Sequence, residues 1–273
     1  MNNYINIVSW NLDFWKKTCN NPKSEYFKSD RIIKLWQDKV YYDLMQLEAD
    51  ILMLQEINPY FLFNKNDYRP LNPSSIYEFS EDNNNYFYHE CLPELAMELR
   101  EVASSSIFWG SAIIVKNKYE YIGNYNNHSF FEEYNYYANH LLMCYKYKLS
   151  NEKTITIINH YKKNDPKIGY AYNENFTNLL KNLIKEIDTD FILLAGDFNT
   201  SSKDIRNRRV FNEIKDIGFI DVTDRIGSTM INYDYQNDYL FVNVELSKYI
   251  ENIQKFSKWN ISDHYGLRCT IKI

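Results

Sequence analysis

The sequence feature that most constrains the fold is a series of short apolar runs that each end at polar side chains. Residues 191–196 read Phe-Ile-Leu-Leu-Ala-Gly, and the run stops at Asp197, with Asn199 only one Phe further on. Apolar runs of this length are typical of strands covered on both faces. Comparable runs end at or carry Asn11, Gln55 with Glu56, His160, Asp238, and Asp263 with His264. One polar strand end is usually a turn, but a whole series indicates that the ends converge and line one site.

The distribution of strands and helices predicts a layered fold. Strands are predicted at 4–12, 49–57, 110–117, 119–125, 140–149, 153–161, 190–196, 237–243 and 264–273. Amphipathic helices are predicted at 29–48, at 172–187 and around 204–217. This alternation favours sheets inside and helices outside, an α/β architecture. We interpret the chain as one domain over 1–273 with an elaborated insertion around 58–109, and the alternative is a second domain in that region.

Composition excludes several classes of protein. The chain has 273 residues, of which 45% are hydrophobic, enough for a sizeable core. Its net charge of −5 argues against a non-specific nucleic-acid coat protein, although a locally basic cleft stays possible. Its four cysteines have no C-x-x-C spacing, which is typical of intracellular thiols rather than a disulfide framework or zinc site. The N-terminus lacks the apolar stretch of a signal peptide, and no run approaches the roughly 20 residues of a membrane span. We therefore expect a soluble cytoplasmic protein.

An ordered set of motifs carries a family resemblance. In chain order they are VSWNL, DILMLQE, GSAIIV, INHY, LLAGDFN, NDYLF and SDHYGL. This set resembles the endonuclease/exonuclease/phosphatase superfamily, which groups metal-dependent nucleases and phosphodiesterases with phosphoinositide phosphatases and sphingomyelinases. The resemblance runs from about residue 4 to 273, without a recognisable motif over 58–109. It implies a DNase I-like fold, a four-layer α/β sandwich of two packed, mostly antiparallel β-sheets flanked by helices.

Three residues are candidate metal ligands. Glu56 follows an apolar strand, and a carboxylate there suits a hard cation such as Mg²⁺ or Mn²⁺. The alternative is a solvated charge. The resemblance implies that Asn11 contacts the metal or a phosphate, and that Asp263 holds the metal or positions His264. The sequence has no His/Cys cluster that would favour zinc instead.

Asp197 and Asn199 are the candidate centre of the chemistry. Hydrolysis of a phosphodiester needs a water held in line with the leaving oxygen and deprotonated as it attacks, and a carboxylate does both. The Asn199 amide donates to a phosphate oxygen without adding negative charge. An extended Asp-Phe-Asn segment directs both polar side chains to one side and turns Phe198 into the core. The alternative is an Asx-type turn that ends the strand.

Histidines supply the remaining candidate groups. The resemblance implies that Asp238 pairs with His264, so that an imidazolium donates to the phosphate as charge builds up. His160 lies where many members of the superfamily carry a histidine and others a tyrosine. Tyr161 is the next residue, so the register is open by one position, and we favour His160. One departure is that the superfamily often has a basic residue before the Asp of NDYLF, whereas this chain has Gln236.

The substrate is predicted from basic residues that follow three of the motifs, of which the first pair is Lys16 and Lys17 after VSWNL. The candidate substrate-binding residues are Lys162, Lys163, Arg206, Arg208 and Arg209. Loops that leave convergent strand ends would ring one cleft and contact neighbouring phosphates, although Lys and Arg are more often plain surface charges. We therefore favour a nuclease acting on DNA or RNA. The alternatives are a phosphatase or phosphodiesterase acting on a lipid, inositol phosphate or nucleotide, and a non-catalytic scaffold on the same fold.

Overall fold

The computed structural model contains two packed β-sheets. The described residues are 4–12, 44, 46–57, 79–80, 86–91, 110–116, 118–125, 142–162, 169–201, 208–257 and 262–273. The first sheet has seven strands in the order β12-β13-β1-β2-β5-β4-β3, and the second has six in the order β10-β11-β9-β8-β7-β6.

The strand bounds are as follows. The first sheet contains β1 (Tyr4–Asn11), β2 (Ile51–Ile57), β3 (Phe79–Ser80), β4 (Tyr86–Cys91), β5 (Gly110–Lys116), β12 (Ile250–Phe256) and β13 (Gly266–Lys272). The second sheet contains β6 (Glu120–Asn124), β7 (Leu142–Lys148), β8 (Thr154–Tyr161), β9 (Phe191–Asp197), β10 (Phe219–Asp221) and β11 (Asp238–Asn243).

Strand pairing brings polar strand ends together. β1 pairs with β2 in parallel, and β8 pairs with β9 in parallel, so the carboxyl ends of each pair lie at one edge. The other pairs are antiparallel, and in one of them Asp238, at the start of β11, lies opposite Asp197, at the end of β9. Both sheets are therefore mixed but mainly antiparallel, as the sequence predicted.

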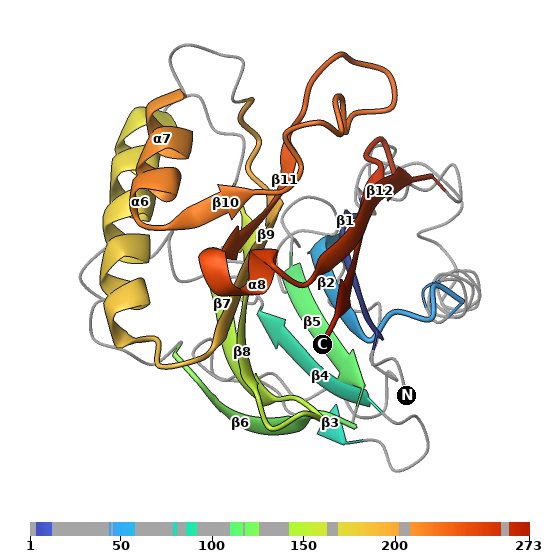
Figure 1. Ribbon diagram of the computed structural model, residues 1–273. Helices are drawn as coiled ribbons and strands as arrows, with labels where there is room; N and C mark the ends of the chain where they lie inside the picture. Colours follow the sequence, from blue (N-terminus) through green and yellow to red (C-terminus); the bar gives the residue numbers. More distant parts are fainter. Residues whose placement is uncertain are drawn as a thin grey trace, which may run out of the picture.

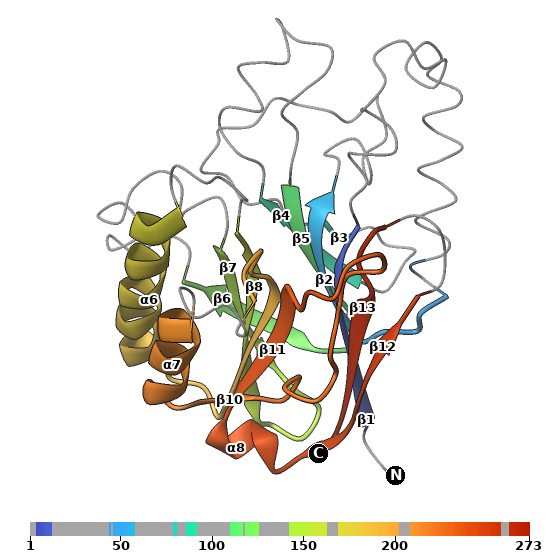
Figure 2. The ribbon, with the colours of Figure 1, turned by 90° about the horizontal axis from the view of Figure 1, so that it is seen from above.

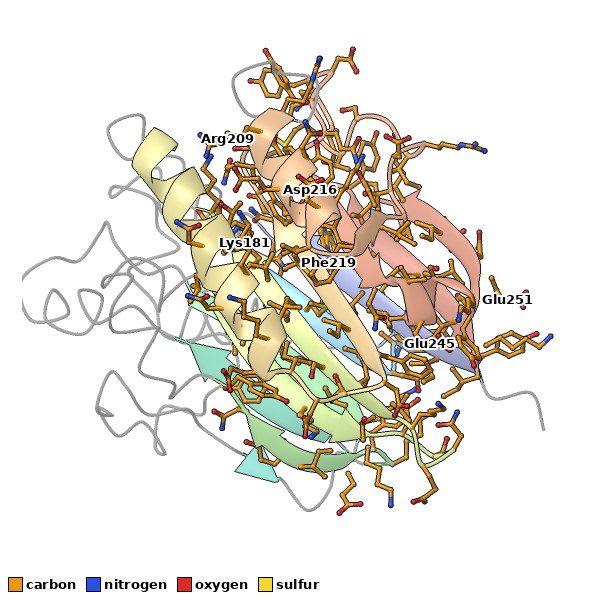
Figure 3. All side chains as sticks on the ribbon, turned by 60° about the vertical axis from the view of Figure 1, so that its left-hand side comes forward. Lys181, Arg209, Asp216, Phe219, Glu245 and Glu251 are labelled. Carbon is orange, nitrogen blue, oxygen red and sulfur yellow. The ribbon has the colours of Figure 1, made fainter. Side chains whose placement is uncertain are left out.

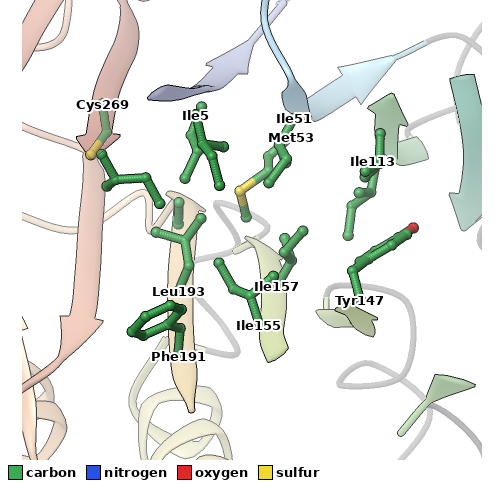
Figure 4. Close-up of a cluster of buried hydrophobic side chains, with 14 of the residues drawn as sticks. Ile5, Ile51, Met53, Ile113, Tyr147, Ile155, Ile157, Phe191, Leu193 and Cys269 are labelled. Atoms are coloured by element: carbon green, nitrogen blue, oxygen red, sulfur yellow. The ribbon is translucent and has the colours of Figure 1, made fainter. Parts of the chain in front are cut away.

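Apolar side chains fill the space between the sheets. Figure 4 shows this core, in which Ile5 and Met53 of the first sheet face Ile155 and Leu193 of the second. All four side chains are buried, and each contributes about 1.5–3 kcal/mol to the free energy of unfolding by leaving water.

Two helices form an outer layer on the second sheet, α6 (Gly169–Glu186) and α7 (Arg208–Asp216). Figures 1 and 2 show them side by side along one flank of the molecule. α6 buries Leu179, Leu180 and Leu183, whose spacing places them on one helical face. This apolar face packs in a second core beneath the helices, which also contains Phe198.

Most predicted elements are confirmed within a few residues, and the differences are local. The sequence did not predict β10, β12 or the short helix α8 (Val244–Ser247). Within 58–109, strand β4 pairs with β5 and so extends the first sheet. The predicted helix at 29–48 lies mostly outside the described residues. In the part of the chain that the structure describes, no helix has the length and apolar character needed to cross a membrane.

Candidate active site

Asp197 is the centre of a buried polar cluster. Its side chain has no solvent exposure. Oδ2 accepts hydrogen bonds from Nδ2 of Asn11, at 2.8 Å, and from Nδ2 of Asn199, at 2.9 Å. Oδ1 accepts a third hydrogen bond from the backbone N–H of Asn199, at 2.7 Å. Such donors stabilise a carboxylate that β9 carries to the edge of the second sheet.

The backbone around Asp197 forms the Asx turn that was the alternative to an extended segment. Asn199 has a φ of 43°, and the bond from its N–H to Asp197 forms an Asx turn, so the chain bends here. The Asn199 amide still reaches Asp197, because the bend folds it back. Phe198 points into the core beside Tyr239 and Phe211, as predicted.

Gly196 is required by a close approach of two strands. Its φ is 143°, and a Cβ atom there would lie 1.8 Å from the carbonyl oxygen of His160 on β8. Only glycine fits such a position. The glycine of the Gly-Asp-Phe-Asn motif therefore permits the pairing of β8 and β9 directly before Asp197.

Glu56 is directed into the same cluster by an irregularity of β2. The pairing of β2 with β5 shifts register between Gln55 and Ile57, and Glu56 has a φ of 50°. Such a bulge re-aims a side chain. Oε1 of Glu56 accepts hydrogen bonds from Nδ2 of Asn11, at 3.1 Å, and from the hydroxyl of Tyr161, at 3.0 Å. Asn11 therefore bridges Glu56 and Asp197, one carboxylate from each sheet.

His264 and Asp238 form a second buried unit. Nδ1 of His264 lies 2.8 Å from Oδ2 of Asp238, and Nε2 lies 3.7 Å from Oδ1 of Asp263. The segment is fixed to β1, because the Trp10 indole donates to the carbonyl of His264 and the hydroxyl of Ser262 donates to the carbonyl of Asn11. The pairing that the resemblance implied is therefore present.

Electrostatics in the cluster indicate which groups carry protons. Burial alone would lower the pKa of His264, but the charge and hydrogen bond of Asp238, with the charges of Asp197 and Asp263, raise it to about 10. Burial raises the pKa of Asp197 to about 8, with contributions from Asp238 and Glu56, while the His264 charge and the Asn199 hydrogen bond act in the opposite direction. His264 is thus an imidazolium near neutral pH, whereas Asp197 without a metal keeps its proton up to about pH 8, because burial and the neighbouring acids disfavour its charge.

The donor set fits a hard divalent cation. Asp197, Asp238 and His264 each offer one ligand atom, and these atoms lie within 4.8 Å of one another. A protonated His264 has no lone pair for a metal, so carboxylate oxygens and the Asn11 amide are the better ligands. Mg²⁺ and Mn²⁺ prefer such oxygen ligands, and a cation would relieve the repulsion among the acids.

The structure separates the two residues between which the sequence left the register open. The ring of His160 is fully buried and stacks on Phe176, with centroids 4.2 Å apart. Its edge contacts Phe198 on the helix side of the second sheet. Tyr161 faces the other side and donates to Glu56. The geometry favours Tyr161, and a catalytic role for His160 stays a prediction without support from its position.

The predicted basic residues occupy different environments. Lys162 is buried rather than exposed, and its Nζ donates to Oγ1 of Thr200 at 2.5 Å. Burial lowers its pKa to about 8, opposed by the charge of Asp197. Arg208 and Arg209 are exposed at the start of α7, where Arg209 pairs with Glu213; Figure 3 shows Arg209 on the helix surface. Lys163 and Arg206 lie outside the described residues.

Sequence reasoning named Gln55 only as a polar strand end, and it missed Asn159 and Thr200, which also hold these groups in place. Gln55 and Asn159 form a buried amide pair between the sheets, and Thr200 accepts from Lys162. The alternation of side chains along a strand was the available signal. It places Asn159 and Tyr161 on one face of β8 and His160 on the other.

Comparison with known proteins identifies the fold. No protein-family model matches the chain, and no curated protein matches it. Among solved structures, the endonuclease domain of TRAS1, a telomere-specific non-LTR retrotransposon, is 14% identical with a TM-score of 0.62, and the match covers 98% of both chains. An AP endonuclease from Archaeoglobus fulgidus is 17% identical, with a TM-score of 0.57 and coverage of 98% of this chain and 100% of the other. D. rerio TDP2 complexed with single strand DNA product is 13% identical, with a TM-score of 0.59 and 98% coverage of both chains. The chain therefore has the DNase I-like fold that its motifs implied.

Proposed function

We propose that the protein is a divalent-metal-dependent phosphodiester hydrolase that cleaves DNA or RNA by in-line attack of water. The main observation in support is the bridge that Asn11 makes between Glu56 and Asp197, beside the His264–Asp238 pair. Acid, amide and imidazolium groups from both sheets meet there, and such groups can deprotonate a water and stabilise the charge that develops on a phosphate.

The metal is proposed to bind at Glu56, Asn11 and Asp263. When bound, Mg²⁺ or Mn²⁺ would neutralise phosphate charge and polarise the phosphorus–oxygen bonds. The repulsion of buried Asp197 by Asp238 and Glu56 supports a cation in this cluster, because a cation compensates a charge that burial makes costly.

The protein groups have separate proposed roles. Asp197, ionised when a cation offsets the charge of its acidic neighbours, would accept a proton from the attacking water. Asn199 orients the Asp197 carboxylate through two hydrogen bonds. The His264 imidazolium donates to a non-bridging phosphate oxygen as negative charge accumulates, and Asp238 keeps it protonated. We propose Tyr161 in place of His160 as the further donor, since its hydroxyl lies in the cluster.

A nucleic-acid substrate is favoured by the surface next to Asp238. The segment between β10 and β11 forms a long loop, visible above β11 in Figure 1. It exposes Tyr233 and Tyr235, whose ring centroids lie 6.4 Å apart. Nucleobases stack on exposed aromatic rings. The three solved structures above carry names that describe endonucleases or a DNA product, which supports the same class. We also propose the cytoplasm as the location, on the basis of the scattered cysteines.

The decisive experiment is a cleavage assay over a panel of phosphoesters. Single- and double-stranded DNA, RNA, sphingomyelin, phosphoinositides and nucleotides are incubated with the protein in Mg²⁺, in Mn²⁺ or in excess chelator. We expect metal-dependent cleavage of a nucleic acid, lost by several orders of magnitude in Asp197→Ala. Asp216→Ala, at an exposed aspartate of α7, is the matched control. Full activity in chelator or in Asp197→Ala would contradict the mechanism, and cleavage of lipid alone would establish the alternative substrate.

The scaffold alternative has its own test. A ligand that binds only the folded state raises the melting temperature. We expect Mg²⁺ or Mn²⁺ to do so in the wild type and not in Glu56→Gln. No shift with either metal, combined with no turnover of the panel, would favour a non-catalytic protein.

A further inference from the structure

A buried amide pair joins the two sheets beneath the candidate active site. Gln55 of β2 and Asn159 of β8 have no solvent exposure. Nε2 of Gln55 donates to Oδ1 of Asn159 at 2.6 Å, and Nδ2 of Asn159 donates to the carbonyl of Leu54 at 3.0 Å. Each strand therefore donates one hydrogen bond to the other across the interior of the sandwich.

On both strands, the amide pair lies next to the residues that form the contact between Tyr161 and Glu56. Gln55 directly precedes Glu56, and Asn159 lies two residues before Tyr161, so Asn159 and Tyr161 share a face of β8. The amide pair and the bond from the Tyr161 hydroxyl to Glu56 are thus successive bridges between β2 and β8.

Adhesion between the sheets does not require these amides. Met53 and Ile157, each two residues before a member of the pair, are buried apolar side chains in the core between the sheets. Replacing a buried polar pair by apolar groups of similar shape is often nearly neutral for stability, whereas removing one partner strands the other. The amides add a directional constraint, because their hydrogen bonds fix the position of β2 along β8 and apolar contacts do not.

The position of β2 along β8 is important for Glu56, because this residue has a left-handed backbone conformation that its surroundings must hold. A glutamate with a φ of 50° beside a bulge is held in its conformation by its surroundings. The residue directly before it, Gln55, is anchored by its side chain to Asn159 and to the carbonyl of Met53. The anchor therefore fixes the strand at the point where Glu56 departs from it.

We propose that Gln55 and Asn159 are a positioning pair that sets the geometry of Glu56 and Tyr161 for phosphoester hydrolysis. The inference rests on the proposed function, and it assigns the pair to the alignment of the reacting groups rather than to contact with substrate.

Stability and activity are compared in an apolar replacement series. Gln55→Met and Asn159→Leu keep the approximate shapes of the side chains. We expect each single variant to lower the melting temperature of the metal-free protein, because the remaining buried amide loses its hydrogen bond to the other. The double variant should recover much of that loss, while its kcat stays about 10- to 100-fold below wild type with little change in KM, the size expected for misplaced catalytic groups. Met53→Leu, an apolar exchange on the same strand, is the matched control and should change neither quantity appreciably.

Two further measurements decide the outcome if the apolar variants fold poorly. The exchanged pair, Gln55→Asn with Asn159→Gln, keeps both amides and should be more active than the double apolar variant. A crystal structure of the double apolar variant should show loss of the 3.0 Å contact between Tyr161 and Glu56. A folded double variant with wild-type kcat, or an exchanged pair no more active than the apolar pair, would overturn the proposal. Wild-type protein that cleaves no phosphoester would instead contradict the proposed function, while the crystallographic contact would still test the positioning.

Discussion

Nδ1 of His264 lies 2.8 Å from Oδ2 of Asp238 in a pair that is almost completely buried. Asp238 begins β11 in the second sheet, and His264 precedes β13 in the first, so the pair spans the sandwich. The carboxylate raises the pKa of the imidazole to about 10 despite burial. The residue that we assign to charge stabilisation is therefore protonated wherever the site is expected to work.

The pH dependence of the rate should reveal this pair. Asp238→Asn removes the negative charge that raises the pKa of His264, so the imidazolium loses its proton at lower pH. We expect the alkaline decline in kcat to begin below its wild-type position, with a larger loss at about pH 9 than at about pH 6. A pH–rate profile measures this, and Asp224→Asn at an exposed site is the control. Identical profiles for wild type and Asp238→Asn would contradict the assigned role.

The stability of the metal-free protein should depend on the protonation of Asp197. Its folded pKa of about 8 exceeds its ordinary value of 3.8, so ionisation costs more in the folded protein than in the unfolded chain. Stability should therefore fall as pH rises from about 4 to about 8. Asp197→Asn should reduce that fall in melting temperature between about pH 5 and about pH 8 in chelator. In Asp197→Asn, a smaller fall in melting temperature should remain above about pH 6.5, because the raised pKa of His264 also makes stability decrease as pH rises. If Asp197→Asn and the wild type show the same difference in melting temperature between these two pH values, the raised pKa of Asp197 is contradicted.

Tyr161 and His160 should differ sharply when each is replaced by phenylalanine. Tyr161→Phe removes only the hydroxyl that contacts Glu56, and loss of one donor to a developing charge costs about 10²- to 10³-fold in kcat. His160→Phe retains an aromatic ring against Phe176 and should leave kcat near wild type. Steady-state kinetics with Mg²⁺ measure both variants. The reverse result would restore the original assignment of His160.

Lys162 should support the structure of the site rather than bind the phosphates of the substrate. It is buried, and its Nζ donates to Oγ1 of Thr200, the residue after Asn199, so Lys162→Met should lower kcat and the melting temperature. The salt dependence of kcat/KM should stay unchanged, because each phosphate contact adds about one unit to the slope against log salt. Arg208→Gln, at an exposed site, tests the contrast and should reduce that slope if Arg208 contacts the backbone of a nucleic acid. A reduced slope in Lys162→Met would place its ammonium group on the substrate.

The exposed tyrosines should matter for nucleic acids and not for small esters. Stacking contributes about 1–3 kcal/mol per base, so replacing Tyr233 and Tyr235 by serine should raise KM for an oligonucleotide about tenfold or more. Hydrolysis of a small chromogenic phosphodiester should be unaffected. Val244→Ser, at another exposed apolar position, is the control. Equal effects on both substrates would exclude a stacking role.

The sequence by itself determined the layered fold and most of the participants in the site. Apolar runs such as 191–196 predict buried strands because continuous apolar character does not survive on an exposed face. Strands that carry Glu56, Asp197 and Asp238 at or near one end predict a shared edge, since polar groups at buried strand ends need partners. These inferences depend on local composition and order, which the sequence states directly.

Only the tertiary structure decided which face each side chain occupies and what it contacts. The choice between His160 and Tyr161 is a one-residue shift, and a shift of one moves a side chain to the opposite face of its strand. The burial of Lys162 and the turn at Asn199 likewise depend on contacts between segments far apart in the chain. The hydrogen bond between Gln55 and Asn159 also depends on such contacts, because these residues are 104 positions apart in the chain. Such pairings are set by how two sheets pack against each other, and residue type and spacing along one strand do not encode that packing.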